Sequence, residues 1–179
     1  MDIFDMNCML GPTRTDREPA FRTPEALLSE MDRLGIAEAL VYASHGVMGH
    51  PAEGNAWVVE ATADHPRLHP CWAVLPPGTG ELPEPEELVA QMRAHGVRAA
   101  RMFPVAHSFP LLERILRPLL RALAGARIPL ILDNGRGSWS HLTDWREVFT
   151  IAEAHPGLPL VLAREGGTTA RALFGVWDV

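Results

Sequence analysis

The sequence has no long hydrophobic segment and nothing typical of export. Apolar runs such as Pro129–Leu132 and Leu158–Ala163 are far shorter than the roughly 20 residues of a membrane-spanning helix. Residues 1–10 lack a basic start followed by a long apolar stretch, so we expect no secretion signal. These absences predict a cytoplasmic protein with no membrane partner.

Cysteines are few and positive charge is not clustered. Cys8 and Cys71 lie far apart and have no metal-type neighbour, which is typical of free thiols in a reducing compartment. Lys and Arg number 16 against 22 Asp and Glu, so the formal net charge is −6. Binding to a phosphate backbone depends on clustered positive charge, and we therefore expect no nucleic-acid partner.

The composition itself is that of a globular domain. The 179 residues are 47% hydrophobic and 21% charged, which is close to the average for folded proteins. The 16 prolines and 15 glycines are spread along the chain and predict boundaries between elements rather than a low-complexity segment. We expect one domain, over residues 1–179.

Short apolar runs alternate with helical patterns at a regular interval. The predicted strands start near Ile3, Glu38, Leu68, Val97, Ile128 and Pro159. These starts lie 35, 30, 29, 31 and 31 residues apart, which is the spacing of a βαβ unit. The pattern predicts six parallel strands connected by helices.

The predicted helices have recognisable ends. Thr23 before Pro24 is typical of an N-cap and a first helical residue, and Gly35 is typical of the helix end. Further helices are expected over residues 85–96, 111–123 and 143–155 and from residue 166 onward. Pro118 should kink or split the helix over 111–123, because proline has no N–H to donate.

Six such units fit an incomplete TIM barrel or an open doubly wound sheet. Eight units would need about 240 residues, close to the roughly 250 typical of a (β/α)8 barrel. The turn after the first strand, residues 7–11, lacks the glycine spacing that holds a dinucleotide in an open sheet. The sequence therefore favours an α/β chain of TIM-barrel (β/α)8 type, truncated to about six parallel βα units.

Several short segments occur in an order that is typical of one family. They are Ile3–Asn7, Leu27–Ile36, Gly54–Asn55, His65–Leu68, Gly96–Arg98, Ile128–Leu132 and Leu160–Ala163. The chain resembles, over essentially its whole length, the first six βα units of amidohydrolase-related TIM-barrel proteins of the metal-dependent hydrolase superfamily. The resemblance implies hydrolysis of a carbon–nitrogen or ester bond, or loss of carbon dioxide from an acid. It also implies a small-molecule substrate and a divalent metal such as zinc.

The metal-binding motif of that family is altered here. The family usually ends its first strand with Asp-x-His-x-His, whereas residues 5–9 read Asp-Met-Asn-Cys-Met. Asp133 and Arg164 take the places of the ligand histidines on strands five and six, and the late aspartate of strand eight would lie beyond Val179. We therefore expect no metal ligands of the usual kind, and the cofactor stays unknown.

Arg164 would discourage a metal nearby. At an effective dielectric constant of about 20, a guanidinium about 4 Å from a unit charge interacts by roughly 4 kcal/mol, and a dication doubles that repulsion. We expect Arg164 to supply the positive charge that the metal supplies in the family. Asp133 or Asp5 would hold it, and it would face an anionic or carbonyl group of the ligand.

The candidate site residues lie near the carboxyl ends of the predicted strands, where the chemistry of a barrel takes place. Asp133 is the candidate general base, and Arg164 and Arg101 are the candidate charge stabilisers. The candidate substrate contacts are Asn7, His45, His107 and Trp139, with the two histidines in loops after their strands. If Arg101 faces the interior, it needs a carboxylate partner such as Asp5 or Asp133.

Structural roles fit several of these residues as well. Asn7 is equally suited to capping a strand end, and Asp133 begins a respectable turn sequence. Strand alternation predicts Asp5, Asn7 and Met9 on one face and Met6 and Cys8 on the other. Cys8 would then be a packed apolar residue rather than a nucleophile. Structural roles at helix ends are expected for His65, His95 and His155.

Three functions remain open from the sequence. The first is a hydrolase or decarboxylase that acts on a small anionic or carbonyl-containing molecule and has a degenerate metal site. The second is a non-catalytic ligand-binding or interaction barrel that has lost its metal. The third is a hydrolase whose altered metal site is completed by another segment or subunit. Unpaired first and sixth strands would also favour a homo-oligomer.

Overall fold

The computed structural model describes residues 2–12, 21–133 and 145–163. The chain divides into two compact units. Unit 1 comprises Met1–Ala73 and Gln91–Ala99, and unit 2 comprises Val74–Ala90 and Ala100–Val179. The expectation of a single domain over residues 1–179 therefore stays a prediction.

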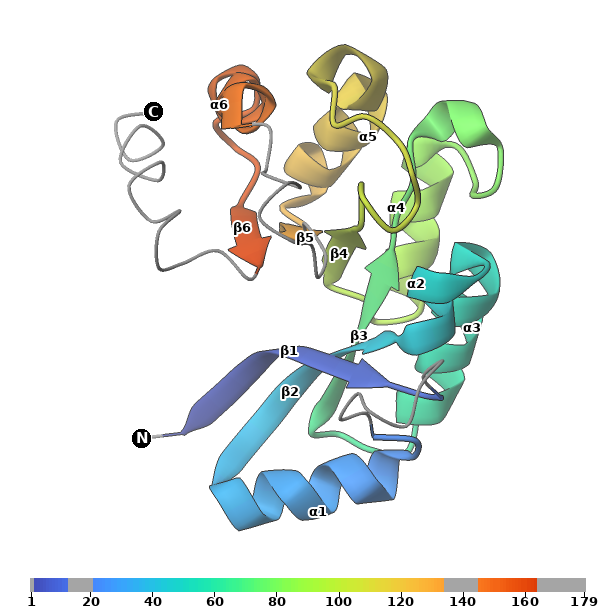
Figure 1. The fold of residues 1–179 in the computed structure, drawn as a ribbon, viewed down its shortest axis with the longest axis vertical. Helices are drawn as coiled ribbons and strands as arrows, with labels where there is room; N and C mark the ends of the chain where they lie inside the picture. Colours follow the sequence, from blue (N-terminus) through green and yellow to red (C-terminus); the bar gives the residue numbers. More distant parts are fainter. Residues whose placement is uncertain (1, 13–20, 134–144, 164–179) are drawn as a thin grey trace. The chain divides into compact units, whose positions relative to one another are not determined.

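Unit 1 contains three parallel strands with their helices (Figure 1). Its elements are β1 (Ile3–Leu10), α1 (Pro24–Leu34), β2 (Ile36–Ala43), α2 (Ser44–Met48), α3 (Pro51–Thr62) and β3 (Leu68–Ala73). β2 pairs in parallel with β1 and with β3. α1 packs against β2, and α3 packs against both β2 and β3.

Unit 2 contains a second set of three parallel strands. Its elements are η1 (Pro77–Thr79), the first part of α4 (Pro85–Ala94), β4 (Ala99–Met102) from Ala100 on, α5 (Glu113–Ala126), β5 (Leu130–Asp133), α6 (Trp145–Ala154) and β6 (Leu160–Ala163). β5 pairs in parallel with β4 and with β6. α5 packs against η1 and α6. Across the described ranges of both units, no helix has the length and apolarity needed to cross a membrane.

The predicted strands are confirmed, because each observed strand begins within two residues of its expected start. The predicted ends of α1 are confirmed as well. The Thr23 side chain accepts a hydrogen bond from the Ala26 N–H at 3.3 Å. Gly35 closes the helix with a φ of 69°, a left-handed conformation that glycine adopts without strain.

One of the two alternatives predicted for Pro118, that it splits its helix, is wrong. Pro118 does not split α5, which runs unbroken from Glu113 to Ala126. Its leucines at 116, 119, 120 and 123 are all buried, and this packing outweighs the one backbone hydrogen bond that proline removes. Between the second and third predicted strands, where the sequence analysis gave no helix bounds, the structure has α2 and α3. The helix expected from residue 166 lies outside the described residues.

An extra residue in β1 changes which side chains share a face. Asp5 is opposite Ala39 on β2, and Cys8 is opposite Val41, so three steps along β1 match two along β2. Such a bulge shifts the alternation of the strand by one residue. The prediction that Asp5 and Cys8 lie on opposite faces is therefore wrong. Their side chains are close enough for a hydrogen bond.

The side chain of Asn55 attaches α3 to the carboxyl end of β3. Its Nδ2 donates to the Ala73 carbonyl at 2.8 Å, and its Oδ1 accepts from the Ala73 N–H at 2.7 Å. α3 also approaches α2 closely, since a Cβ at Gly54 would lie 2.4 Å from the Gly46 Cα. A buried amide and a pair of glycines therefore fix the helices that follow β2.

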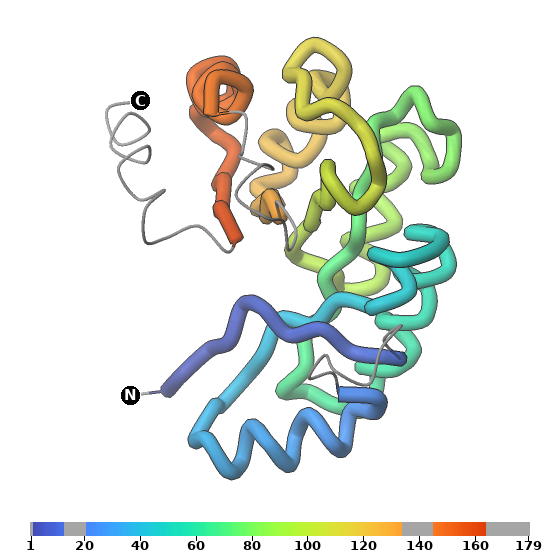
Figure 2. Tube along the Cα trace, viewed as in Figure 1, coloured from blue at the N-terminus to red at the C-terminus, as the bar shows by residue number. Residues whose placement is uncertain are grey.

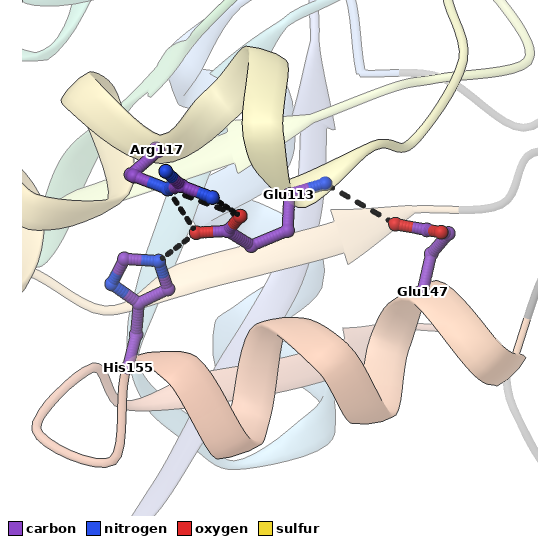
Figure 3. Close-up of polar contacts among 4 residues, drawn as sticks. All are labelled: Glu113, Arg117, Glu147 and His155. Atoms are coloured by element: carbon purple, nitrogen blue, oxygen red, sulfur yellow. Dashed lines mark hydrogen bonds and ion pairs between the residues drawn. The ribbon is translucent and has the colours of Figure 1, made fainter.

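A buried carboxylate joins α5 to α6 (Figure 3). Glu113 accepts hydrogen bonds from Arg117 one turn later, with Nη2 at 2.8 Å, and its Oε1 lies 2.9 Å from Nε2 of His155. The Glu113 N–H at the start of α5 donates to the Glu147 carboxylate of α6 at 3.2 Å. The expected structural role of His155 is thus confirmed. At the start of α5, the N-cap residue Leu112 makes no side-chain hydrogen bond, and Glu147 of α6 accepts from a helix N–H in its place.

Replacing Gly54 with alanine should destabilise the protein although alanine favours helices. The added Cβ would clash with the Gly46 backbone, and we expect a loss of about 1–3 kcal/mol in the free energy of unfolding. Gly125→Ala in α5 is the matched control, because nothing lies within 4 Å of its Cβ position. It should stabilise by up to about 1 kcal/mol. Urea unfolding measures both, and equal effects would contradict the proposed close approach.

Glu113 should make stability fall in acid. The Arg117 hydrogen bond, followed by the His155 hydrogen bond and the charges of both partners, lowers the pKa of Glu113 to about 2 from an ordinary value of 4.5. Its contribution is therefore complete above the ordinary pKa and is lost as pH falls from about 4.5 towards 2. The melting temperature of Glu113→Gln should approach that of the wild type over this range. Glu153→Gln, on the exposed face of α6, is the control and should leave the wild-type profile unchanged.

Candidate functional site

The strongest polar feature near the strand ends in unit 2 is an ion pair between β4 and β5. Nη2 of Arg101 lies 2.5 Å from Oδ2 of Asp133. The two side chains are 0% and 1% exposed. A charge buried this far from water is stable only with a partner of opposite charge. The expectation that Arg101 needs a carboxylate is confirmed, and Asp133 is the carboxylate that it contacts.

The register of the strands creates this contact. Arg101 is opposite Ile131 on β5, so Asp133 lies two residues further towards the carboxyl end and on the same face. The Arg101 carbonyl also accepts a hydrogen bond from the Val74 N–H at 2.8 Å. The backbone that carries the guanidinium is therefore held in place before any side chain contributes.

A phenylalanine lies next to this ion pair. Phe103 comes two residues after Arg101, and the guanidinium carbon of Arg101 lies over its ring at 5.5 Å from the centroid. This is within the range of a cation–π interaction. The ring of His107 contacts the same phenylalanine edge to face, with 5.6 Å between centroids and 70° between planes. Phe103 thus contacts two of the predicted site residues, Arg101 and His107.

Backbone hydrogen bonds within the segment after β4 hold its turns in place. The path of this segment from β4 to α5 can be followed in Figure 2. The His107 N–H donates to the Phe103 carbonyl at 3.0 Å, and the Phe109 N–H donates to the Pro104 carbonyl at 3.1 Å. Ser108 adopts a φ of 56°, in the left-handed region that a non-glycine residue rarely enters. These constraints hold the His107 ring against Phe103.

Two other predicted contacts lie in unit 1. Asn7 is exposed and lies inside β1 rather than at its end, because the strand continues to Leu10. Its N–H donates to the Asp5 carboxylate at 2.8 Å. His45 is half-buried in the short helix α2 instead of a loop, and its ring meets Trp57 of α3 at 5.1 Å between centroids.

Trp139 and Arg164 lie outside the described residues. The structure therefore does not test the idea that Arg164 supplies the charge of a missing metal. It does describe the two carboxylates expected to hold Arg164. Asp133 already contacts Arg101, and Asp5 accepts the Asn7 N–H. A role for Arg164 at either carboxylate stays a prediction.

The Cys8 thiol has the packed environment that the sequence predicts. Cys8 is buried, and its burial raises the pKa of the thiol to about 12, with the nearby Asp5 charge and a hydrogen bond to Asp5 adding to the effect. A thiol with so high a pKa carries almost no thiolate at neutral pH, and the thiolate is the nucleophile. This environment agrees with the packing role expected for Cys8.

Metal-binding residues do not gather within the described ranges. Over residues 2–12, 21–133 and 145–163, no three His, Cys, Asp or Glu side chains come together in a group that could hold a metal ion. A structural zinc needs four such ligands, and a catalytic zinc needs three. The described donors therefore do not fit the divalent metal that the family resemblance implies.

No protein-family model matches the chain, and no curated protein matches it. Solved structures do match, with 39 chains similar to it. All those compared below have less than 25% sequence identity to this chain, so the likeness concerns the fold.

Three of these structures illustrate the likeness. An amidohydrolase from Mycobacterium avium subsp. paratuberculosis has 20% identity and a TM-score of 0.62, and the match covers 86% of this chain and 50% of that one. 5-Carboxyvanillate decarboxylase from Novosphingobium aromaticivorans has 18% identity and a TM-score of 0.63, and the match covers 84% of this chain and 53% of that one. A protein named "probable 2-pyrone-4,6-dicarboxylic acid hydrolase" from Acinetobacter baumannii has 12% identity and a TM-score of 0.62, and the match covers 90% of this chain and 58% of that one.

The chain has the amidohydrolase fold. This confirms the predicted α/β class of TIM-barrel type, with six parallel strands in the described residues. The chain spans between half and three fifths of the length of these three structures. The likeness concerns the fold, so the function of the residues brought together by β4 and β5 is a matter for proposal.

Sequence reasoning missed Phe103, which contacts both Arg101 and His107 in this amidohydrolase fold. Strand alternation carries the signal that could have found it, since Arg101 and Phe103 are two residues apart. A phenylalanine after a buried strand is usually assigned to the core, and Phe103 is indeed 2% exposed. Its second role emerges only from the turn that brings His107 back onto its ring.

Cys8 should be almost unreactive in the folded protein. A pKa of about 12 instead of 9.0 leaves about a thousandfold less thiolate at neutral pH, and burial slows access further. Alkylation with iodoacetamide at pH 8, followed by peptide mass spectrometry, should label Cys8 slowly in buffer and rapidly in urea. Asp5→Asn should increase the native rate far less than urea does, because burial is the larger cause. Rapid labelling of the native thiol would contradict this environment.

Proposed function

We propose that this chain carries part of the site of a hydrolase or decarboxylase that acts on a small anionic molecule. The observation that supports this proposal most strongly is the buried Arg101–Asp133 ion pair near the carboxyl ends of two adjacent parallel strands. In folds of this type, the carboxyl ends of the strands carry the chemistry. A guanidinium held there by a carboxylate provides a fixed positive charge for an anionic substrate.

The named activities of the structural neighbours support the substrate class. One is a 5-carboxyvanillate decarboxylase complexed with manganese and a substituted nitrobenzoic acid. Another, the Acinetobacter baumannii protein, has citric acid bound. A third is a dihydroorotase. The ligands named for the first two are carboxylic acids, which agrees with a positively charged group as the central feature of a substrate site.

The described contacts indicate a separate role for each residue in the proposed reaction. Asp133 fixes the orientation of Arg101, and Arg101 stabilises negative charge that develops on the substrate. His107, at the edge of the cluster and half-buried, contacts the substrate and can exchange a proton with it. Asp133 as general base, Arg164 as a second charge stabiliser, and Asn7, His45 and Trp139 as contacts remain parts of the proposal.

We further propose that the metal site is degenerate. The described residues offer no set of three ligands, and the Arg101 guanidinium lies directly on the carboxylate of Asp133. A dication beside that guanidinium would be repelled. No step of the proposed chemistry therefore passes through a metal, and the fixed charge of Arg101 takes over part of its electrostatic role.

Two further expectations accompany this proposal. Within the described residues, β1 pairs with one strand, β2, and makes one isolated bridge from Leu10 to Phe21. Ile3, Phe4 and Met6 on β1 are 44–48% exposed. Such an edge favours self-association, so a homo-oligomer stays a prediction that sedimentation velocity can test. A cytoplasmic location also stays a prediction.

Removal of the buried charge pair should weaken anion binding. Arg101→Met alone would leave Asp133 buried without its partner, at a cost of about 3–5 kcal/mol in the free energy of unfolding. The double variant Arg101→Met/Asp133→Leu avoids that cost and should remain folded. We expect it to weaken citrate binding at least tenfold, measured by isothermal titration calorimetry, and to remove turnover of carboxylated substrates such as 5-carboxyvanillate or 2-pyrone-4,6-dicarboxylate.

Arg121→Met is the control, because it removes an exposed arginine from α5 and should leave both readouts unchanged. Citrate binding without turnover in the wild type would favour the non-catalytic ligand-binding alternative. Citrate binding of wild-type strength in the folded double variant would contradict the proposal. One tightly bound Zn²⁺ or Mn²⁺ per chain, lost on changing Asp133, would contradict the degenerate metal site.

A further inference from the structure

Phe103 is placed to do more than fill the core. It is 2% exposed, as expected for an apolar residue beside a buried strand. Yet its ring contacts two polar groups from different parts of the chain, the guanidinium of Arg101 at 5.5 Å and the imidazole of His107 at 5.6 Å. A core phenylalanine with a purely apolar role would be surrounded by aliphatic side chains. This one contacts the two side chains that the proposed function uses.

The two contacts differ in their physical origin. The guanidinium over the ring is attracted by the negative charge of the aromatic face. The imidazole meets the ring at 70°, the edge-to-face arrangement that aromatic pairs prefer. Both interactions depend on the ring itself, and an aliphatic side chain of equal volume would supply neither.

Both neighbours of the Phe103 ring are also held in place by other contacts. His107 is tied to Phe103 by the hydrogen bond from its N–H to the Phe103 carbonyl. Arg101 is tied to Asp133 on β5. With both neighbours anchored, the position of the phenyl ring determines how far the imidazole lies from the ion pair.

We propose that Phe103 is a positioning residue that holds His107 at a fixed distance from the Arg101–Asp133 pair. This inference rests on the proposed function, in which Arg101 and His107 both serve the substrate. Phe103 itself need not touch the substrate. Its ring sets the geometry in which one substrate meets a fixed positive charge and an imidazole together. A displacement of about 1 Å at such a site can cost a hundredfold in rate.

The test compares an aliphatic with an aromatic replacement. Phe103→Met keeps most of the apolar volume and removes the ring, whereas a fluorinated phenylalanine at position 103 keeps the shape and weakens the attraction for the guanidinium. Phe149→Met is the matched control, since Phe149 lies on α6 and stacks on Trp145 instead. Citrate is the probe for binding, and thermal melting checks the fold of each variant.

The expected outcome has three parts. Phe103→Met should weaken citrate binding about tenfold, the fluorinated variant should fall between it and the wild type, and Phe149→Met should bind normally. In ¹H–¹³C spectra, the His107 ring signals should carry a ring-current shift from Phe103 that disappears only in Phe103→Met. Where turnover is found, kcat/KM should fall in the same order as citrate binding.

The outcomes separate this inference from the proposed function. If His107→Gln weakens citrate binding but Phe103→Met and the fluorinated variant do not, Phe103 is a core residue only and the inference is wrong. If neither His107→Gln nor the Arg101→Met/Asp133→Leu variant affects binding, the proposed function itself is wrong. Should Phe103→Met fail to fold, the fluorinated variant decides, because wild-type binding by it would remove the role of the ring.

Discussion

The ion pair between Arg101 and Asp133 is the interaction on which the described part of the site depends. Removing two charges from water costs several kcal/mol for each ion, and only close contact in the right geometry offsets that cost. The contact exists because β4 and β5 are paired with Arg101 opposite Ile131. A slip of one residue in that register would turn one of the two side chains to the other face and leave two unpaired buried charges.

The same physical rule recurs between the helices of unit 2. Glu113 is a buried carboxylate whose cationic partner, Arg117, lies on its own helix, while His155 and Glu147 come from the α6 side (Figure 3). The Arg101–Asp133 pair connects strands β4 and β5, and the Glu113 cluster connects helices α5 and α6. The clusters differ in their neighbours. Of these two clusters, only the Arg101–Asp133 pair lies beside the Phe103 ring, which also contacts His107, and the proposed function therefore rests on this pair rather than on Glu113.

Local signals in the sequence predicted most of the fold and little of the site. Strand starts and the ends of α1 depend on residues close in sequence, and they were found within two residues. The bulge in β1 was missed because an extra residue leaves no trace in a short apolar pattern, and it reversed the expected face of Cys8 relative to Asp5. The helix over residues 111–123 was predicted from its leucines, but the sequence could not decide whether Pro118 splits it, because that depends on how well those leucines are buried.

The sequence by itself determined the six repeating βα units and the loss of the histidines at residues 5–9, because periodicity and residue identity are readable along one chain. It also determined that a buried Arg101 needs a carboxylate, since charge must be neutralised away from water. It left two partners open, Asp5 and Asp133. Only the tertiary structure decided for Asp133, because the choice depends on the register of two strands about 30 residues apart in sequence, and no local pattern specifies register between distant segments.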